Sequence, residues 1–241
     1  MNPDDLAVAC RQIGISGGAY FFELETLEIG ERFGLDGFEF YFIGRGGVLG
    51  EVEPAVVTSA FGYFSASLVE QTWTSACKKL PPREGAKAYA SARHAFGRSK
   101  LSDLPGLGPL CDALEVINHA ADGRGLPLYA ASAAEPVPDD LPARTMHLLS
   151  LLREFRGSAH LLAVIASELD PKVAHYLRRP YDMEMFGWDG EEAIEVTDEE
   201  RNRLVRANQL TDRLVASAYG ALDDASWAAL LEGLAAVDAA L

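Results

Sequence analysis

The segment that most constrains the fold is HLLSLLREFRGSAHLLAVIASEL, at residues 147–169. At about 100° per residue its apolar side chains share one broad side, which predicts an amphipathic helix packed on a core. That side holds Leu148, Leu151, Leu152, Phe155, Ala159, Leu162 and Ala166. Arg153, Arg156 and His160 fall roughly opposite, on a face predicted to be solvated or to contact another element. Charged groups cost free energy in a core unless they are paired, so this helix must sort its polar side chains.

A narrow strip at the edge of the apolar side carries His147, Ser150 and Glu154. His147 and Glu154 are two turns apart, about 10 Å along the axis, so they would flank a third group rather than bond each other. Two interpretations remain open. Either this strip borders a ligand pocket, or Glu154 pairs with an arginine while His147 caps a helix or bonds a carbonyl. Gly157 can also break the helix, which would place His160 on a new one.

The rest of the chain also has helical periodicity, which predicts an all-α, multi-helix fold. The predicted helices cover residues 4–13, 18–33, 54–61, 65–79, 83–98, 107–122, 141–156, 159–169, 171–179, 198–220 and 223–240. Period-two patterns are weak. Residues 38–43 (FEFYFI) have strand-like aromatics but are bounded by glycines, so a strand and a short helix both fit.

Three long connections are predicted, at residues 44–54, 123–142 and 178–196. Long connections in compact domains are often lids or packing arms. The last one is acidic and aromatic, and we place a boundary there. The chain is thus divided into a helical ligand-binding body at residues 1–180 and a C-terminal helical segment at residues 181–241.

Charge disfavours nucleic acid as a partner. The 241 residues include 36 acidic and 21 basic side chains, with a formal net charge of −15. Phosphate backbones and anionic membrane surfaces attract lysine and arginine, so this balance opposes both. No run of about 18 apolar residues and no signal peptide is present, which predicts a cytoplasmic protein without a membrane span. Three scattered cysteines predict neither a disulfide framework nor a structural zinc site.

The N-terminal third supplies further candidate residues. Arg45 lies between glycines and beside Tyr41, where it could bind a carboxylate or phosphate bidentately, or cap a helix end. The glycine spacing fits neither the dinucleotide fingerprint nor a P-loop. The spacing of His147, Glu154 and His160 does not match metal-binding helix motifs, so we predict no metal and no cofactor.

Five segments taken together resemble an actinobacterial family of largely uncharacterised helix-turn-helix proteins. They are YFIGRGGVLG (41–50), FGYFSASLV (61–69), GLPLYAASAAE (125–135), LLREFRGSAH (151–160) and TDRLVASAYGALDDA (211–225). The resemblance implies an all-α body followed by a winged-helix C-terminal module similar to MarR-type DNA readers. It implies no known activity.

Two departures from that family matter. Only eight residues, DGEEAIEV, separate Gly187-Trp188 from Thr197, where members carry about two helices and a wing. A recognition helix needs roughly ten residues, so the resemblance implies a reduced winged-helix remnant from which the DNA reader is deleted. Phe155 and Ser158 also stand where the family usually has a histidine and an aspartate.

Two main hypotheses follow. The first is a protein that binds a small organic molecule in a helical pocket and acts as an acid/base enzyme of bacterial secondary metabolism. Its catalytic residues would be His147, Glu154 and His160, and its binding residues Tyr41, Arg45, Tyr63 and Arg156. The alternative is a non-catalytic, ligand-sensing regulatory protein derived from a helix-turn-helix transcription factor. It would signal through a homodimer or a partner protein. An active transcription factor is a third hypothesis, opposed by the charge and the missing reader.

Overall fold

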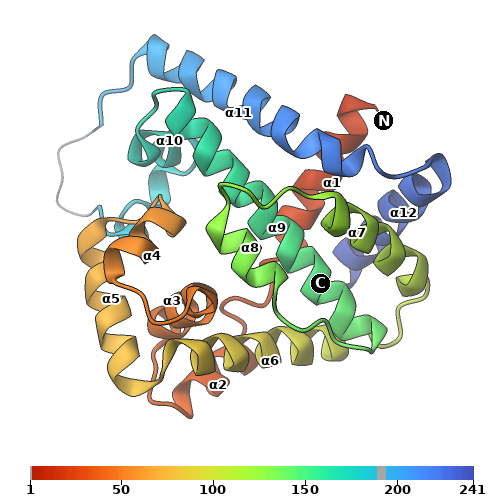
Figure 1. Ribbon diagram of the computed structural model, residues 1–241, viewed down its shortest axis with the longest axis horizontal. Helices are drawn as coiled ribbons and strands as arrows, with labels where there is room; N and C mark the ends of the chain where they lie inside the picture. The colour runs from red at the N-terminus through yellow and green to blue at the C-terminus, as the bar shows by residue number, and fades with distance from the viewer. Residues whose placement is uncertain (1, 189–193) are drawn as a thin grey trace.

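The computed structural model describes residues 2–188 and 194–241, and within them every regular element is a helix (Figure 1). This confirms the all-α prediction. The α-helices are α1 Pro3–Ser16, α2 Leu24–Glu31, α3 Gly37–Gly46, α4 Pro54–Phe61, α5 Ala66–Lys79, α6 Pro82–Leu101, α7 Leu107–Ala120, α8 Pro127–Ala133, α9 Leu141–Ala166, α10 Pro171–Arg178, α11 Asp198–Tyr219 and α12 Asp224–Ala240. Three short 3-10 helices cover Gly47–Leu49, Pro180–Asp182 and Glu184–Phe186.

Local capping explains where several of these helices begin. The Asp36 side chain accepts a hydrogen bond from the backbone N–H of Glu39, and the Glu39 side chain accepts one from the backbone N–H of Asp36, so α3 starts with a complete capping box. Thr197 and Glu200 form the same arrangement at the start of α11. Asp140 caps α9 from the position before its first residue. Each cap satisfies backbone N–H groups that a helix start otherwise leaves unpaired.

Helix α9 forms the centre of the fold. Its 26 residues span about 39 Å, and it packs against α1, α6, α7, α8 and α11. Figure 1 shows it crossing the middle of the molecule, with α6 along one side and α11 along the other. Buried residues therefore occur on nearly every side of α9, including His147, Ser150 and His160. On the side predicted to be solvated or in contact with another element, Arg156 and His160 contact α11, whereas Arg153 lies over the Phe21 ring.

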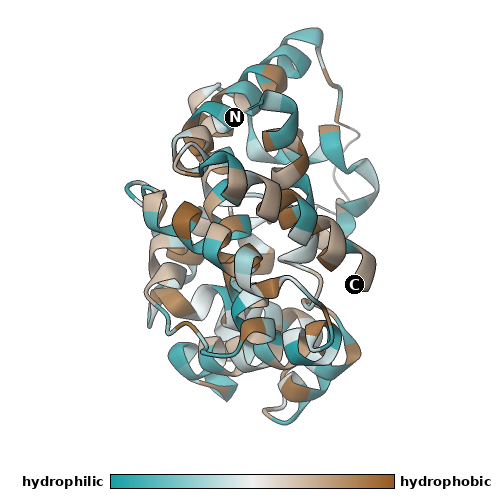
Figure 2. Ribbon diagram, turned by 90° about the vertical axis from the view of Figure 1, so that its right-hand side faces the viewer, coloured by the Kyte–Doolittle hydropathy of each residue, from teal (hydrophilic) through white to brown (hydrophobic). Residues whose placement is uncertain are grey.

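Most of the other helices bury one side, whereas α3 is buried on nearly every side. Figure 2 shows hydrophobic and hydrophilic residues alternating along single helices, as amphipathic helices require. One hydrophobic core runs from α1 through α9 to α12, with Ile13, Phe42, Leu152 and Leu234 among its fully buried members. The C-terminal helices contribute directly to this core, since α12 packs on α1 and α7. The division into a body and a C-terminal segment stays a prediction. Residues 189–193, which belong to the boundary connection and to the region where the DNA reader is predicted to be deleted, lie outside the described residues.

The structure corrects several predicted elements. The prediction of a helix at 18–33 is wrong for residues 18–23, because the chain turns after α1 and α2 begins only at Leu24. Gly17 explains the turn: a Cβ there would lie 2.5 Å from the backbone oxygen of Leu149, so α1 ends in close contact with α9. Residues 38–43 are helical, within α3. The connection predicted at 123–142 contains the short helix α8, and that at 44–54 contains a 3-10 helix.

The two helices predicted on either side of Gly157 are one continuous helix, α9. Gly157 has no neighbour within 4 Å of where a Cβ would lie, so nothing in the packing forces a break. Near the end of α9, Leu162 and Ala166 are exposed, which corrects the prediction that they lie in the core.

We expect two glycine substitutions to have opposite effects on stability. Gly157→Ala should stabilise the protein by about 0.5–1 kcal/mol, because alanine favours the helix and meets no neighbour there. Gly44→Ala should destabilise it by about 1–3 kcal/mol, because the new Cβ would lie 2.3 Å from the Tyr89 ring. Urea denaturation of both variants measures the difference, and equal effects would contradict this packing.

No helix among the described residues has the length and apolar character needed to cross a membrane.

Candidate functional site

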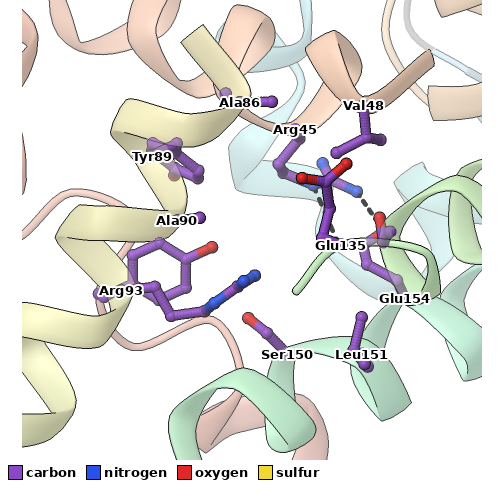
Figure 3. A pocket seen from close by; sticks show the side chains of 13 residues that line it. Arg45, Val48, Ala86, Tyr89, Ala90, Arg93, Glu135, Ser150, Leu151 and Glu154 are labelled. Carbon is purple, nitrogen blue, oxygen red and sulfur yellow. Dashed lines mark hydrogen bonds and ion pairs between the residues drawn. The ribbon is translucent and has the colours of Figure 1, made fainter. Parts of the chain in front are cut away.

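An arginine-rich hollow opens between α3, α6 and α9 (Figure 3). Arg45 comes from α3, Tyr89 and Arg93 from α6, and Ser150 and Glu154 from α9. The remaining lining residues are Tyr20, Gly44, Val48, Ala86, Ala90, Ser132, Glu135 and Leu151. The helices approach closely because Gly44 leaves room for the Tyr89 ring against α3.

Glu154 is held by two arginines. Arg45 donates from Nε to Oε1 at 3.0 Å and from Nη2 to Oε2 at 2.9 Å, a bidentate pair, and Arg153 Nη1 donates to Oε1 at 3.0 Å. Arg45 also donates to the Tyr41 hydroxyl, and its guanidinium lies 4.5 Å from the centre of the Phe61 ring. Glu154 therefore pairs with arginines, as one of the two open interpretations expected. The rest of that interpretation is wrong: His147 lies inside α9 and faces Arg93 and His94, so among the described residues it neither caps a helix nor bonds a carbonyl.

Electrostatics keep this cluster charged. Burial by itself would raise the pKa of Glu154, but the nearby charges of Arg45 and Arg153 outweigh it and hold that pKa below its usual value. Burial likewise opposes the charge of Arg45, and Glu154 reverses that effect and raises the pKa of Arg45. Both oxygens of Glu154 accept hydrogen bonds from guanidinium groups, which favour the charged form of this carboxylate and make it a weak proton acceptor.

Arg93 is positioned by His147. Its Nη2 lies 2.9 Å from His147 Nδ1, and because a guanidinium only donates, Nδ1 accepts and the ring hydrogen is on Nε2. His94 Nε2 lies 3.2 Å from the same Nδ1. Burial, with the charges of Arg93 and His94, lowers the pKa of His147 to about 2, so the ring is neutral. Figure 3 shows Arg93 reaching from α6 toward Ser150 on α9.

The surroundings of the hollow carry excess positive charge. The Glu154 cluster contains two guanidinium groups and one carboxylate. Glu135 is neutralised by Arg83 at 2.6 Å. Arg93 has no carboxylate within 4 Å in the part of the chain that the structure describes, and its buried Nε has no hydrogen-bond partner there. The charges of the lining residues balance, and the two arginines that pair with the hollow's carboxylates from outside the lining, Arg153 and Arg83, give the surroundings an excess of two positive charges in a protein whose net charge is −15.

The hollow is narrow. The cavity volume open to the centre of a water molecule is about 30 Å³, which is enough for about two water molecules. Burial raises the pKa of both Tyr20 and Tyr89, so their hydroxyls are uncharged. Ser150 Oγ donates to the backbone oxygen of Gly17 at 2.7 Å. Only a small group fits without movement of the lining side chains.

The remaining predicted site residues gather elsewhere. His160 is thirteen residues beyond His147 on α9, about 20 Å along the axis. His160 stacks on Tyr63, with ring centroids 6.4 Å apart, and Arg156 donates to Asp212 at 3.4 Å. The structure thus brings Tyr41, Arg45 and Glu154 together. His147 contacts Arg93. Tyr63, His160 and Arg156 lie toward the C-terminal end of α9.

Sequence reasoning missed the α6 contribution to the hollow. Arg93 and His94 are adjacent in the predicted helix 83–98, but one arginine on an ordinary helix carries no signal by itself. The contribution of Glu135 was also missed, because Glu135 lies in a segment predicted as a loop. Among the described residues, no three His, Cys, Asp or Glu side chains lie close enough to hold a metal ion.

Fold and site together define an all-α protein with an arginine-rich internal hollow. The sequence profile of a helix-turn-helix family matches residues 9–241, nearly the whole chain, and the protein belongs to that family. Neither the curated proteins nor the solved structures include a significant match to this chain.

Proposed function

We propose that this protein is a non-catalytic regulatory protein that binds a small organic anion between Arg45 and Arg93. One observation carries the proposal: Arg93 faces the hollow without a carboxylate partner among the described residues. An uncompensated, partly buried guanidinium is costly unless an anion pairs with it. Family membership supports a regulatory role.

The arrangement supports the sensor hypothesis better than the acid/base enzyme. Both oxygens of Glu154 are engaged by arginines, and His147 is a neutral acceptor whose pKa lies at about 2. A general base works best when its pKa is near the operating pH, and neither group meets that condition. The role in secondary metabolism and the catalytic assignments of His147, Glu154 and His160 therefore remain predictions without geometric support here.

We further propose that the protein acts through a partner protein or a homodimer in the cytoplasm of an actinobacterium, not through DNA. The net charge of −15 opposes phosphate contacts, and the first turn of α11 carries Asp198, Glu199 and Glu200. Deletion of the DNA reader is part of this proposal. A gel shift with genomic fragments at low salt that showed tight binding would overturn it.

Calorimetric titration with acetate, oxalate and inorganic phosphate tests the anion site. We expect at least one of them to bind, and Arg93→Gln to weaken that binding by about 10- to 100-fold, as loss of a charge-assisted hydrogen bond predicts. Arg201→Gln, an exposed arginine on α11, is the matched control and should leave binding unchanged. Proton NMR should show acetate unaltered after hours with the protein. Absence of binding, or equal binding by the Arg93 variant, would contradict the site, and turnover would contradict a non-catalytic role.

A further inference from the structure

A second hollow adjoins α10, the helix that follows α9 in the chain. Its lining residues are Tyr63, Ala174, His175, Arg178, Arg179 and Phe186. The space that a water's centre can reach is about 180 Å³, several times that of the first hollow. It can therefore hold a ring-sized group, whereas the first hollow, between Arg45 and Arg93, is too small for one.

Buried polar atoms without partners gather at this hollow. Tyr63 Oη and His175 Nε2 are buried and lack a hydrogen-bond partner among the described residues, as does His160 Nε2 behind the Tyr63 ring. His175 is only 8% exposed and His160 4%. Most buried polar side-chain atoms in folded proteins are hydrogen-bonded, so the unpaired Tyr63 Oη and His175 Nε2, both from residues that line this hollow, indicate a missing partner.

The surrounding contacts hold these groups in place. The Tyr63 ring lies between two imidazoles, 6.4 Å from His160 and 6.3 Å from His175. The Thr211 hydroxyl donates to the backbone oxygen of Ala207 at 2.7 Å, so at 2.9 Å it accepts from His160 Nδ1. His160 Nε2 is therefore a bare acceptor. Burial lowers the pKa of His160 to about 4 and raises that of Tyr63 to about 12, so both rings are uncharged at neutral pH.

Arg178 supplies an unpaired positive charge. Arg179 pairs with Asp182 at 3.5 Å and Arg156 with Asp212 at 3.4 Å, but Arg178 has no carboxylate within 4 Å in the described ranges. Burial and the charges of Arg156 and Arg179 lower the pKa of Arg178, and a bound anion would relieve this unfavourable environment.

The walls of the hollow are aromatic. The His175 ring lies 3.9 Å from that of Phe186, and Phe186 in turn stacks on Phe64 at 4.2 Å. We propose that this hollow binds a small aromatic carboxylate, whose carboxylate pairs with Arg178 and accepts hydrogen bonds from Tyr63 Oη and His175 Nε2. Its ring packs against the edge of Phe186, whose ring already contacts His175 and Phe64, and His175 carries its hydrogen on Nε2. This site is independent of the proposed function of the first hollow.

Calorimetry with benzoate and benzamide tests this inference. We expect benzoate to bind, and benzamide, its uncharged counterpart, to bind at least tenfold more weakly. Arg178→Gln should weaken benzoate binding at least tenfold and Tyr63→Phe several-fold, while Arg201→Gln leaves it unchanged. Arg178 lines the hollow but is solvent-exposed as a whole residue, so its variant should fold normally, which circular dichroism checks.

The outcomes separate the two sites. If Arg93→Gln abolishes benzoate binding and Arg178→Gln does not, benzoate occupies the first hollow, and this inference is overturned while the proposed function stands. If benzoate binds but acetate, oxalate and phosphate do not, the proposed function fails and this site remains. Equal affinity for benzoate and benzamide, or no binding of benzoate, would overturn the aromatic carboxylate site.

Discussion

Replacing Glu154 by glutamine is expected to lower the free energy of unfolding by about 3–5 kcal/mol, a large share of the stability of an ordinary domain. Glutamine has the same shape but no charge, so the variant leaves Arg45 buried beside Arg153 without a counter-ion. The Arg45 and Glu154 side chains are only 13% and 12% exposed, so water cannot replace the lost partner well. Tm should fall by about 10 °C for a chain of this length.

Chemical denaturation of Glu154→Gln and of the matched variant Glu84→Gln measures this effect. Glu84 also pairs with a basic side chain, Lys87 at 2.8 Å, but is 55% exposed. Its substitution should change stability by no more than about 0.5 kcal/mol. The double variant Arg45→Met with Glu154→Gln should recover part of the loss, because it removes the uncompensated charge. A Glu154 variant as stable as the Glu84 variant would show that the pair is solvated.

Acidification from pH 7 to pH 5 is expected to destabilise the protein strongly. The pKa is lowered to about 2 for His147 and to about 4 for both His94 and His160, with burial as the main cause. An unfolded histidine has a pKa of about 6.5, so below that pH the unfolded chain binds more protons and folding loses free energy. At pH 5, His147 and His160 together lower the free energy of unfolding by about 4 kcal/mol, and His94 lowers it further.

Unfolding free energies measured from pH 8 to pH 5 check this prediction. The loss should begin near pH 6.5, above the range in which carboxylates titrate. The lowered pKa values of Glu154 and Glu39 place the loss of their contributions at still lower pH. His147→Asn keeps an acceptor for Arg93 but cannot ionise, so its slope below pH 6 should be smaller by about 1.4 kcal/mol per pH unit. The exposed His119→Asn is the control. An unchanged slope for His147→Asn would contradict the burial of this imidazole.

Much of the fold followed from local patterns. Apolar residues at helical spacing predicted α4 at its observed bounds, and those of α5, α7, α10, α11 and α12 within one or two residues. The errors came from neighbours distant in sequence. The chain turns at Gly17 because α9 lies against it, and Gly157 stays helical because nothing there opposes the helix.

The site divides in the same way. Periodicity placed Glu154 at the edge of the apolar side of its helix. The glycines on either side of Arg45 and the nearby Tyr41 indicated an arginine able to bind a carboxylate. Their pairing joins residues 109 apart in the chain, which one sequence cannot indicate. Arg93 and Arg178 were missed because an arginine on a helix has no local property that distinguishes a paired one from an unpaired one.

The sequence by itself determined that this chain forms helices, where most of them begin and end, and which ionisable residues lie beside apolar surface. Helix propensity, capping and periodicity depend on residues within a few turns of one another, so they can be recognised along the chain. Only the tertiary structure decided that Glu154 neutralises Arg45 while Arg93 and Arg178 have no carboxylate partner among the described residues. Coulomb interactions depend on distance and burial in space, which the packing of α6 and α10 against α9 and of α3 against α6 creates.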